Sequence, residues 1–159
     1  MKQASLLAFC ILTACGADAA PTFDPLPFVG TWRGRWKDDT GRRGGLEMRV
    51  VDNGTELEFE CDLLGGALPG VTVPTERFVA EVGAHQATLR GHDSFVFGEI
   101  TGHLLADGTL VIDCDGVRGN VSRLHAEGSW SGDKVELLVD VSYDGSLRTS
   151  VAEVSLARM

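Results

Sequence analysis

Hydrophobic and polar residues alternate in short segments along the chain from residue 28 onward. Between Val135 and Tyr143 the odd-numbered positions are all apolar or aromatic, and most even-numbered positions are polar. Residues 46–50 and 57–61 alternate in the same way. Because successive side chains of a β-strand point to opposite faces of its sheet, each run predicts a strand with one buried face and one solvated face.

Pairs of turn-forming residues separate the alternating segments, and no long stretch repeats apolar residues at helical spacing. Asn53-Gly54 and Asp107-Gly108 suit tight hairpins, because glycine and asparagine accept positive φ angles. Short hairpins make consecutive strands antiparallel neighbours, so we expect a meander of about nine or ten strands. Closure removes the exposed edges of such a meander. We therefore predict an all-β domain over residues 28–159, an antiparallel up-and-down barrel of about eight to ten strands, with a β-sandwich as the alternative.

The first fifteen residues follow a different pattern. Lys2 gives a short positive start, and residues 4–14 form an apolar run without a charge. This order is typical of an export signal, and the run is shorter than the roughly 20 apolar residues that a membrane-spanning helix needs. Residues 1–14 are therefore interpreted as a signal peptide, which places the mature protein outside the cytoplasm.

The end of this signal, Leu12-Thr13-Ala14-Cys15, resembles the lipobox of bacterial lipoproteins. The resemblance implies cleavage before Cys15 and acylation of that residue, which would anchor the protein to a membrane. Gly16, rather than aspartate, follows the cysteine, which by the same resemblance implies sorting to the outer membrane in a cell with two membranes. A simple secretory signal cut near Ala20 is the alternative. Residues 15–27 carry three prolines and no periodicity, so they are expected to form the lipidated cysteine and a tether.

Charge and cysteine content narrow the function classes further. The formal net charge is −9, which argues against nucleic acid as a partner, because binding of phosphates needs clustered Lys and Arg. Cys61 and Cys114 remain after removal of the signal, and in an oxidising compartment a disulfide between them is the expected state. Two buried free thiols or metal ligands are the alternatives, although no Cys-x-x-Cys or paired histidines accompany them.

A short motif opens the first predicted strand. Gly30-Thr31-Trp32 resembles the Gly-x-Trp signature of lipocalins and of the wider calycin barrels. The resemblance implies that Trp32 closes one end of the core and that an arginine near the last strand packs over it, Arg158 or, as the alternative, Arg148. Gly128-Ser129-Trp130 repeats the form of the first motif, through an internal duplication or through the bias of a glycine-rich chain.

One segment, residues 63–71, is apolar, rich in glycine and free of charge. We interpret it either as a loop that plugs one end of the barrel or as a hydrophobic lip at a ligand mouth, since exposed apolar patches usually mark contacts. In the second interpretation the ligand-binding side chains are Leu64, Leu68 and Val71. The glycines at candidate inward positions either leave room for a cavity or allow the strands to bend; they are Gly34, Gly98, Gly102 and Gly128.

Patterns typical of catalysis are weak in this chain. His92-Asp93-Ser94 contains the residue types of a hydrolase triad, but neighbours on a strand point to opposite faces and no Gly-x-Ser-x-Gly elbow is present. The acidic and basic pairs at residues 38–39 and 42–43 suit an exposed hairpin. We therefore expect no catalytic residues, no metal and no cofactor.

These observations favour a non-catalytic, lipid-anchored binding protein whose barrel holds one small apolar or amphipathic ligand. The alternative is a structural or protein-interaction lipoprotein of the envelope, an inhibitor or assembly factor with a filled core. The sequence identifies neither the ligand nor a protein partner.

Overall fold

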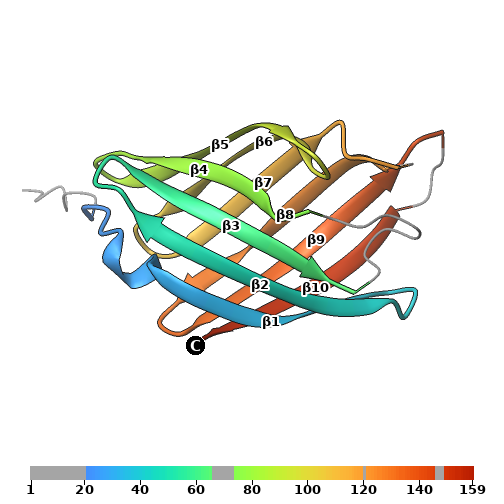
Figure 1. The fold of residues 1–159 in the computed structure, drawn as a ribbon, viewed down its shortest axis with the longest axis horizontal. Coiled ribbons are helices and arrows are strands. Elements are labelled where there is room, and N and C mark those ends of the chain that lie inside the picture. The colour runs from blue at the N-terminus through green and yellow to red at the C-terminus, as the bar shows by residue number, and fades with distance from the viewer. Residues whose placement is uncertain (1–20, 66–73, 120, 146–148) are drawn as a thin grey trace, which may run out of the picture.

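The computed structural model describes residues 21–65, 74–119, 121–145 and 149–159, and it contains a closed ten-stranded barrel. Each strand pairs antiparallel with the strands before and after it, and the last strand closes against the first (Figure 1). The predicted meander and its closure into a barrel are confirmed, and the β-sandwich alternative is wrong. The elements are η1 (Leu26–Phe28), β1 (Gly30–Asp38), β2 (Arg43–Asp52), β3 (Glu56–Leu64), β4 (Glu76–Val82), β5 (Gln86–Ser94), β6 (Gly98–Leu105), β7 (Thr109–Asp115), β8 (Val121–Ser131), β9 (Lys134–Tyr143) and β10 (Thr149–Arg158).

The alternation in the sequence becomes an inner and an outer barrel face. Val50 of β2 lies opposite Phe59 of β3, and Met48 lies opposite Cys61, and all four side chains are buried. Leu138 of β9 lies on the outer face and is 57% exposed. A shift of one residue in the pairing of two strands would turn the buried side chains out to solvent, so the pairing register is strongly specified. No helix in the described part of the chain is both long and apolar enough to cross a membrane.

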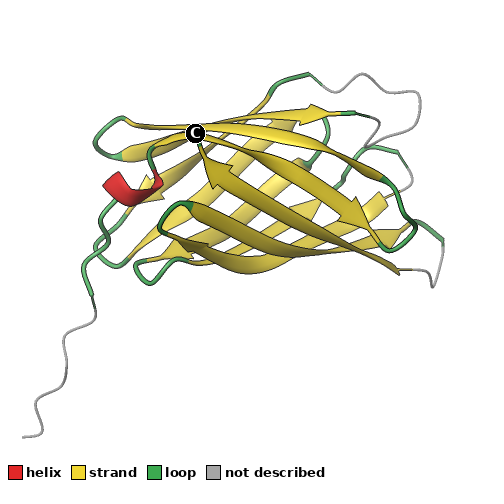
Figure 2. Cartoon of the chain, turned by 90° about the horizontal axis from the view of Figure 1, so that it is seen from below, coloured by secondary structure: helices red, strands yellow, loops and turns green. Residues whose placement is uncertain are grey.

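The two ends of the barrel differ. One of them, here called the closed end, carries the β2–β3, β4–β5, β6–β7 and β8–β9 turns, and its interior is filled by side chains with almost no exposure, among them Leu57, Leu104 and Leu156. The opposite end, the open end, carries the β1–β2, β5–β6 and β7–β8 connections. The single helical turn η1 lies beside the closed end (Figure 2).

The segment before β1 packs onto the closed end. Phe23 and Phe28 are buried and stack with their ring centroids 5.4 Å apart. The backbone N–H of Phe23 donates to the carbonyl of Ala84 in the β4–β5 turn, at 2.9 Å. Residues 23–27 therefore belong to the barrel domain, and the predicted tether is wrong over this stretch, because burial of the Phe23 ring holds the backbone against the barrel.

Glycines on the strands allow neighbouring backbones to approach closely. A Cβ atom at Gly34 would lie 1.9 Å from the carbonyl oxygen of Ser155, and one at Gly128 would lie 1.9 Å from that of Glu136. Neither glycine lines the interior cavity described below. At Gly34 and Gly128 the structure therefore supports the second interpretation, in which glycines allow the strands to bend and to pack closely, over the first, in which they leave room for a cavity.

Candidate functional site

The closed end is sealed by a cluster of aromatic rings. Trp32 has no exposed surface and meets Trp130 edge to face, with centroids 4.9 Å apart. Its indole N–H donates to the carbonyl of Phe28 at 3.0 Å. The Arg158 guanidinium carbon lies 4.7 Å from the centroid of a Trp32 ring, close enough for a cation–π interaction. The structure thus brings Trp32 and Arg158 together, next to Gly30 at the start of β1.

Above this aromatic cluster the barrel encloses a cavity of about 280 Å³. Its wall is almost entirely aliphatic and aromatic, with side chains from all ten strands or the loops that join them. The apolar lining includes Trp36, Met48, Phe59, Phe78, Leu89, Ile100, Leu110, Ile112, Leu124, Ala126, Trp130, Val139 and Val154. Small-molecule sites in proteins have this character, with volumes that begin at about 300 Å³. The cavity is therefore the candidate functional site.

Two hairpin loops cover part of the cavity at the open end. The side chains of Val96, between β5 and β6, and Val117, between β7 and β8, are buried and line the cavity. The loops are joined because the backbone N–H of Arg118 donates to the carbonyl of Val96 at 2.8 Å. Arg118 also places its guanidinium carbon 3.7 Å from the ring centroid of Phe95.

A buried carboxylate holds the β5–β6 loop in place. Glu76, at the start of β4, accepts hydrogen bonds from the Ser94 hydroxyl and, at 3.0 Å, from the backbone N–H of Val96. Backbone pairing between β4 and β5 begins only at Val79 and Arg90. The Glu76 side chain therefore links the two strands at the open end, beyond the last backbone pair.

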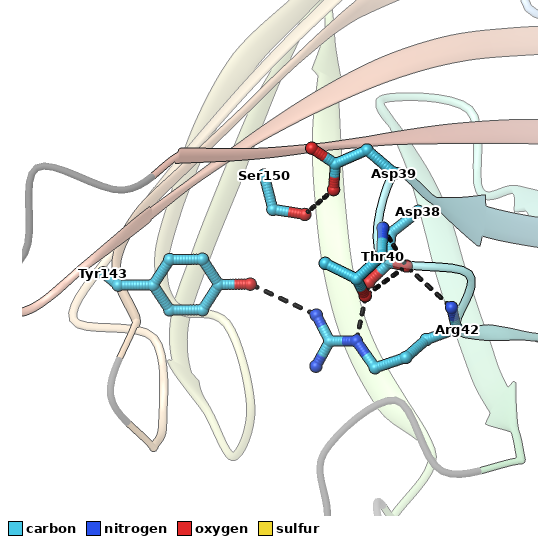
Figure 3. A network of polar contacts seen from close by, with 6 residues as sticks. All are labelled: Asp38, Asp39, Thr40, Arg42, Tyr143 and Ser150. Carbon is cyan, nitrogen blue, oxygen red and sulfur yellow. Dashed lines mark hydrogen bonds and ion pairs between the residues drawn. The ribbon is translucent and has the colours of Figure 1, made fainter.

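The polar side chains in the cavity wall gather at the open end, beside the β1–β2 turn (Figure 3). The buried carboxylate of Asp38 accepts hydrogen bonds from the backbone N–H groups of Thr40 and Arg42, from the Thr40 hydroxyl and from Arg42 Nε at 2.6 Å. Burial alone would raise the pKa of Asp38, but the hydrogen bonds from Thr40 and Arg42 outweigh it and hold the pKa below its ordinary value.

Arg42 connects this turn to the far strand β9. Its Nη2 donates to the Tyr143 hydroxyl at 3.2 Å, and its bond to Asp38 raises the pKa of the guanidinium. Ser150 of β10 is buried and donates to Asp39 Oδ1 at 2.6 Å. These bonds join β1 and the β1–β2 turn to β9 and β10 around one side of the mouth.

Sequence reasoning missed these mouth residues. We expected an exposed hairpin at residues 38–43, and Asp38 is instead buried. The sequence held a usable signal, because every second side chain of a strand lies on the same face. Asp38 is two residues after Trp36 and six after Trp32, both of which face inward, and Tyr143 ends the inward-facing series that begins at Val135.

Cys61 and Cys114 are free thiols, so the predicted disulfide between them is wrong in this structure. Cys61 lies on β3 and Cys114 on β7, with three strands between them in the barrel. A disulfide needs Cα atoms about 4.4–6.8 Å apart, whereas adjacent strands are already about 4.8 Å apart. Both side chains line the cavity, and burial raises the pKa of each thiol to about 12. Neither thiol is an activated nucleophile.

The predicted lip is only partly within the described residues. Leu64 is 48% exposed and does not line the cavity, whereas its neighbour Leu63 does, so the role of Leu64 in ligand binding stays a prediction. Alternate residues of a strand face opposite sides of the sheet, which explains why Leu63 and Leu64 differ in position. Cys15, Leu68, Val71 and Arg148 lie outside the described residues, as do the side chains of His92 and Asp93.

A separate cluster on the outer face links β7 and β8. His125 Nδ1 lies 2.9 Å from Asp113, its Nε2 lies 3.0 Å from Glu127, and Arg123 also bonds Asp113. The hydrogen bond to Asp113 is the main cause that raises the pKa of His125 above its ordinary value of 6.5, and the hydrogen bond to Glu127 adds to it. No group of three or more metal-ligating side chains is placed to hold a metal ion in the part of the chain that the structure describes.

The raised pKa of His125 predicts a pH-dependent contribution to stability. Because the folded state holds the proton more tightly than the unfolded state, the contribution is fully present below the unfolded pKa of about 6.5 and is lost as the pH rises through the folded pKa. Urea unfolding of the wild type and of His125→Gln, at about pH 6 and pH 9, should show a larger difference between the two proteins at the lower pH. An equal difference at both pH values would contradict this prediction.

The chain was compared with protein-family models and with curated protein sequences, and neither comparison found a match. The fold and the site therefore define this protein only as a closed antiparallel barrel with an apolar internal cavity.

Proposed function

We propose that this protein is a non-catalytic binding protein that holds one small apolar or amphipathic ligand inside its barrel. The observation that carries the proposal is the apolar cavity of about 280 Å³ between the aromatic cluster and the open end. Burial of apolar ligand surface against such a wall supplies the driving force, about 25 cal/mol for each Å² removed from water. A structural or interaction lipoprotein with a filled core, the alternative, would not need this space.

We also propose that the protein acts outside the cytoplasm, anchored to a membrane by acyl chains on Cys15 and, in a cell with two membranes, on the outer one. The lipobox-like segment Leu12 to Cys15 supports the anchor. The packing of Arg158 over Trp32 supports the likeness to Gly-x-Trp barrels, whose interiors hold small ligands. The raised pKa of both cavity thiols argues against a cysteine nucleophile in the cavity.

Native mass spectrometry tests the proposed function. The full chain carrying Cys15→Ser is purified from the periplasm and weighed before and after denaturation. A bound mass that departs on denaturation supports the binding barrel and gives the ligand class. A bare polypeptide mass that stays unchanged after incubation with lipid extracts and with 1-decanol would contradict it. The mass of wild-type protein extracted from membranes reports any acyl chains on Cys15.

Filling the cavity should abolish binding. Ala126 is buried and lines the cavity, so Ala126→Phe places a ring in the space proposed for the ligand. We expect its affinity for 1-decanol, measured by calorimetry, to fall at least about tenfold, equivalent to about 1.4 kcal/mol. Ala157→Phe is the matched control, because Ala157 is exposed on the outer face. Equal binding by both variants would show that decanol lies elsewhere.

A further inference from the structure

The charge of the cavity wall is balanced within the protein. Among the described residues that line the cavity, Asp38 and Arg42 are the charged ones, and they pair with each other at 2.6 Å. The Asp38 side chain is 4% exposed, so this pair is largely withdrawn from water on the carboxylate side. A ligand in the cavity therefore meets a wall with no net charge among these residues.

The hydrogen-bonding groups left at the mouth are mainly donors. The oxygens of Asp38 already accept from Thr40 and Arg42. Arg42 has five N–H donors, of which Nε is bound to Asp38 and one on Nη2 to Tyr143. The Tyr143 hydroxyl accepts that bond and keeps its own hydrogen for a further acceptor.

A third hydrogen-bond donor lies on β1 two residues before Asp38, farther from the open end. The indole Nε1 of Trp36 is buried and has no hydrogen-bond acceptor among the described residues, and the Trp36 side chain forms part of the cavity wall. Because Nε1 has essentially no accessible surface and lies against Gly44, the donors that a guest reaches at the mouth are those of Arg42 and Tyr143.

We propose that the mouth selects an amphiphile with an uncharged, hydrogen-bond-accepting head group, such as a hydroxyl, an ester carbonyl or an amide. The head contacts Arg42 and Tyr143, and a single alkyl chain occupies the cavity. This inference rests on the proposed function. The cavity of about 280 Å³ gives room for a single alkyl chain of moderate length.

Charged head groups fit this mouth less well. A carboxylate would lose hydration beside Asp38 without gaining a cation of its own, because Asp38 already compensates Arg42. An ammonium group would meet donors where it needs acceptors. A neutral acceptor loses least on leaving water and still completes the bonds of Tyr143 and Arg42.

A matched set of ten-carbon ligands tests the head-group preference. The full chain carrying Cys15→Ser is titrated with 1-decanol, decanoate and decylamine at about pH 8 by calorimetry, where the acid and the amine are charged. We expect 1-decanol to bind at least about tenfold more tightly than either charged ligand, a difference of about 1.4 kcal/mol. Tyr143→Phe should weaken decanol binding about two- to tenfold, the equivalent of one neutral hydrogen bond, while Ser155→Ala on the exposed face leaves it unchanged.

Asp38→Asn is the most informative variant, because it removes the carboxylate that neutralises Arg42 and leaves the positive charge of Arg42 available to a ligand at the mouth. In this variant decanoate should gain at least about tenfold relative to 1-decanol, as expected for a charge-assisted hydrogen bond. Equal affinities of decanol and decanoate for the wild-type mouth, or unchanged decanol binding by Tyr143→Phe, would overturn the head-group inference alone. Failure of all three ligands to bind would overturn the proposed function as well.

Discussion

Replacing Trp32 with alanine is expected to lower the free energy of unfolding by about 3–5 kcal/mol, the range for removal of a large buried aromatic side chain. Trp32 has no exposed surface, and its ring meets Trp130 edge to face at 4.9 Å. Its removal also leaves Arg158 without the ring over which it lies and the carbonyl of Phe28 without its donor. The segment before β1 would then lose its hydrogen bond to the closed end through Trp32.

The measurement is urea unfolding followed by circular dichroism, which does not depend on the tryptophan that is removed. Leu138→Ala is the control, since this side chain is apolar but 57% exposed, and substitutions at such surface positions usually change stability by less than about 0.5 kcal/mol. A loss below about 1 kcal/mol for Trp32→Ala would show that the aromatic cluster is not the stabilising core of the closed end.

Alanine at Gly34 or at Gly128 is expected to destabilise the barrel by about 3 kcal/mol or more, the upper part of the range for overpacking. In each case the added Cβ would lie 1.9 Å from a carbonyl oxygen of the neighbouring strand, Ser155 or Glu136. A rotamer change cannot relieve a clash with backbone, so the strands must separate and lose ladder hydrogen bonds. The direction is opposite to the usual effect of Gly→Ala, which stabilises a compatible site by about 0.4–1 kcal/mol.

Gly45→Ala is the matched control on β2. Its added Cβ would lie 3.2 Å from the Cβ of Leu64, a tight contact that a small shift relieves and far milder than the 1.9 Å approach to backbone at the other two positions. Chemical denaturation of the three variants should place Gly45→Ala near the wild type and the other two far below it. If Gly34→Ala and Gly128→Ala unfold with the wild type, the close approach of β1 to β10 and of β8 to β9 is contradicted.

Local sequence patterns predicted most of the fold, because two local properties determine it. Alternation fixes which side chains of a strand face inward, as at Val135 and Leu138, and glycine-containing turns fix how one strand follows the next. Closure follows because a long meander leaves unpaired edges. The tether error at Phe23 has a different origin, since a single phenylalanine among prolines shows no periodicity and its burial depends on contacts with distant turns.

The candidate site was much less accessible to sequence reasoning. The cavity is a property of facing walls, and whether space remains depends on how side chains from all ten strands interdigitate. The mouth network shows the same dependence, because Arg42 and Tyr143 are a hundred residues apart in the chain and meet only through the barrel. The disulfide prediction failed for this reason too: the meander puts Cys61 and Cys114 on non-neighbouring strands, and only the closed barrel shows that the two thiols do not meet across it.

The sequence alone determined the all-β class, the meander and the inward face of the strands that alternate clearly, and it favoured closure into a barrel over a β-sandwich. These features arise from the two-residue period of a strand and from turn chemistry, both of which act over a few neighbouring residues. Tertiary structure alone decided that one end is packed and the other hollow, and that Asp38 neutralises Arg42 at the mouth. Such features depend on strand stagger and on side-chain volumes summed around the barrel, which no local pattern encodes.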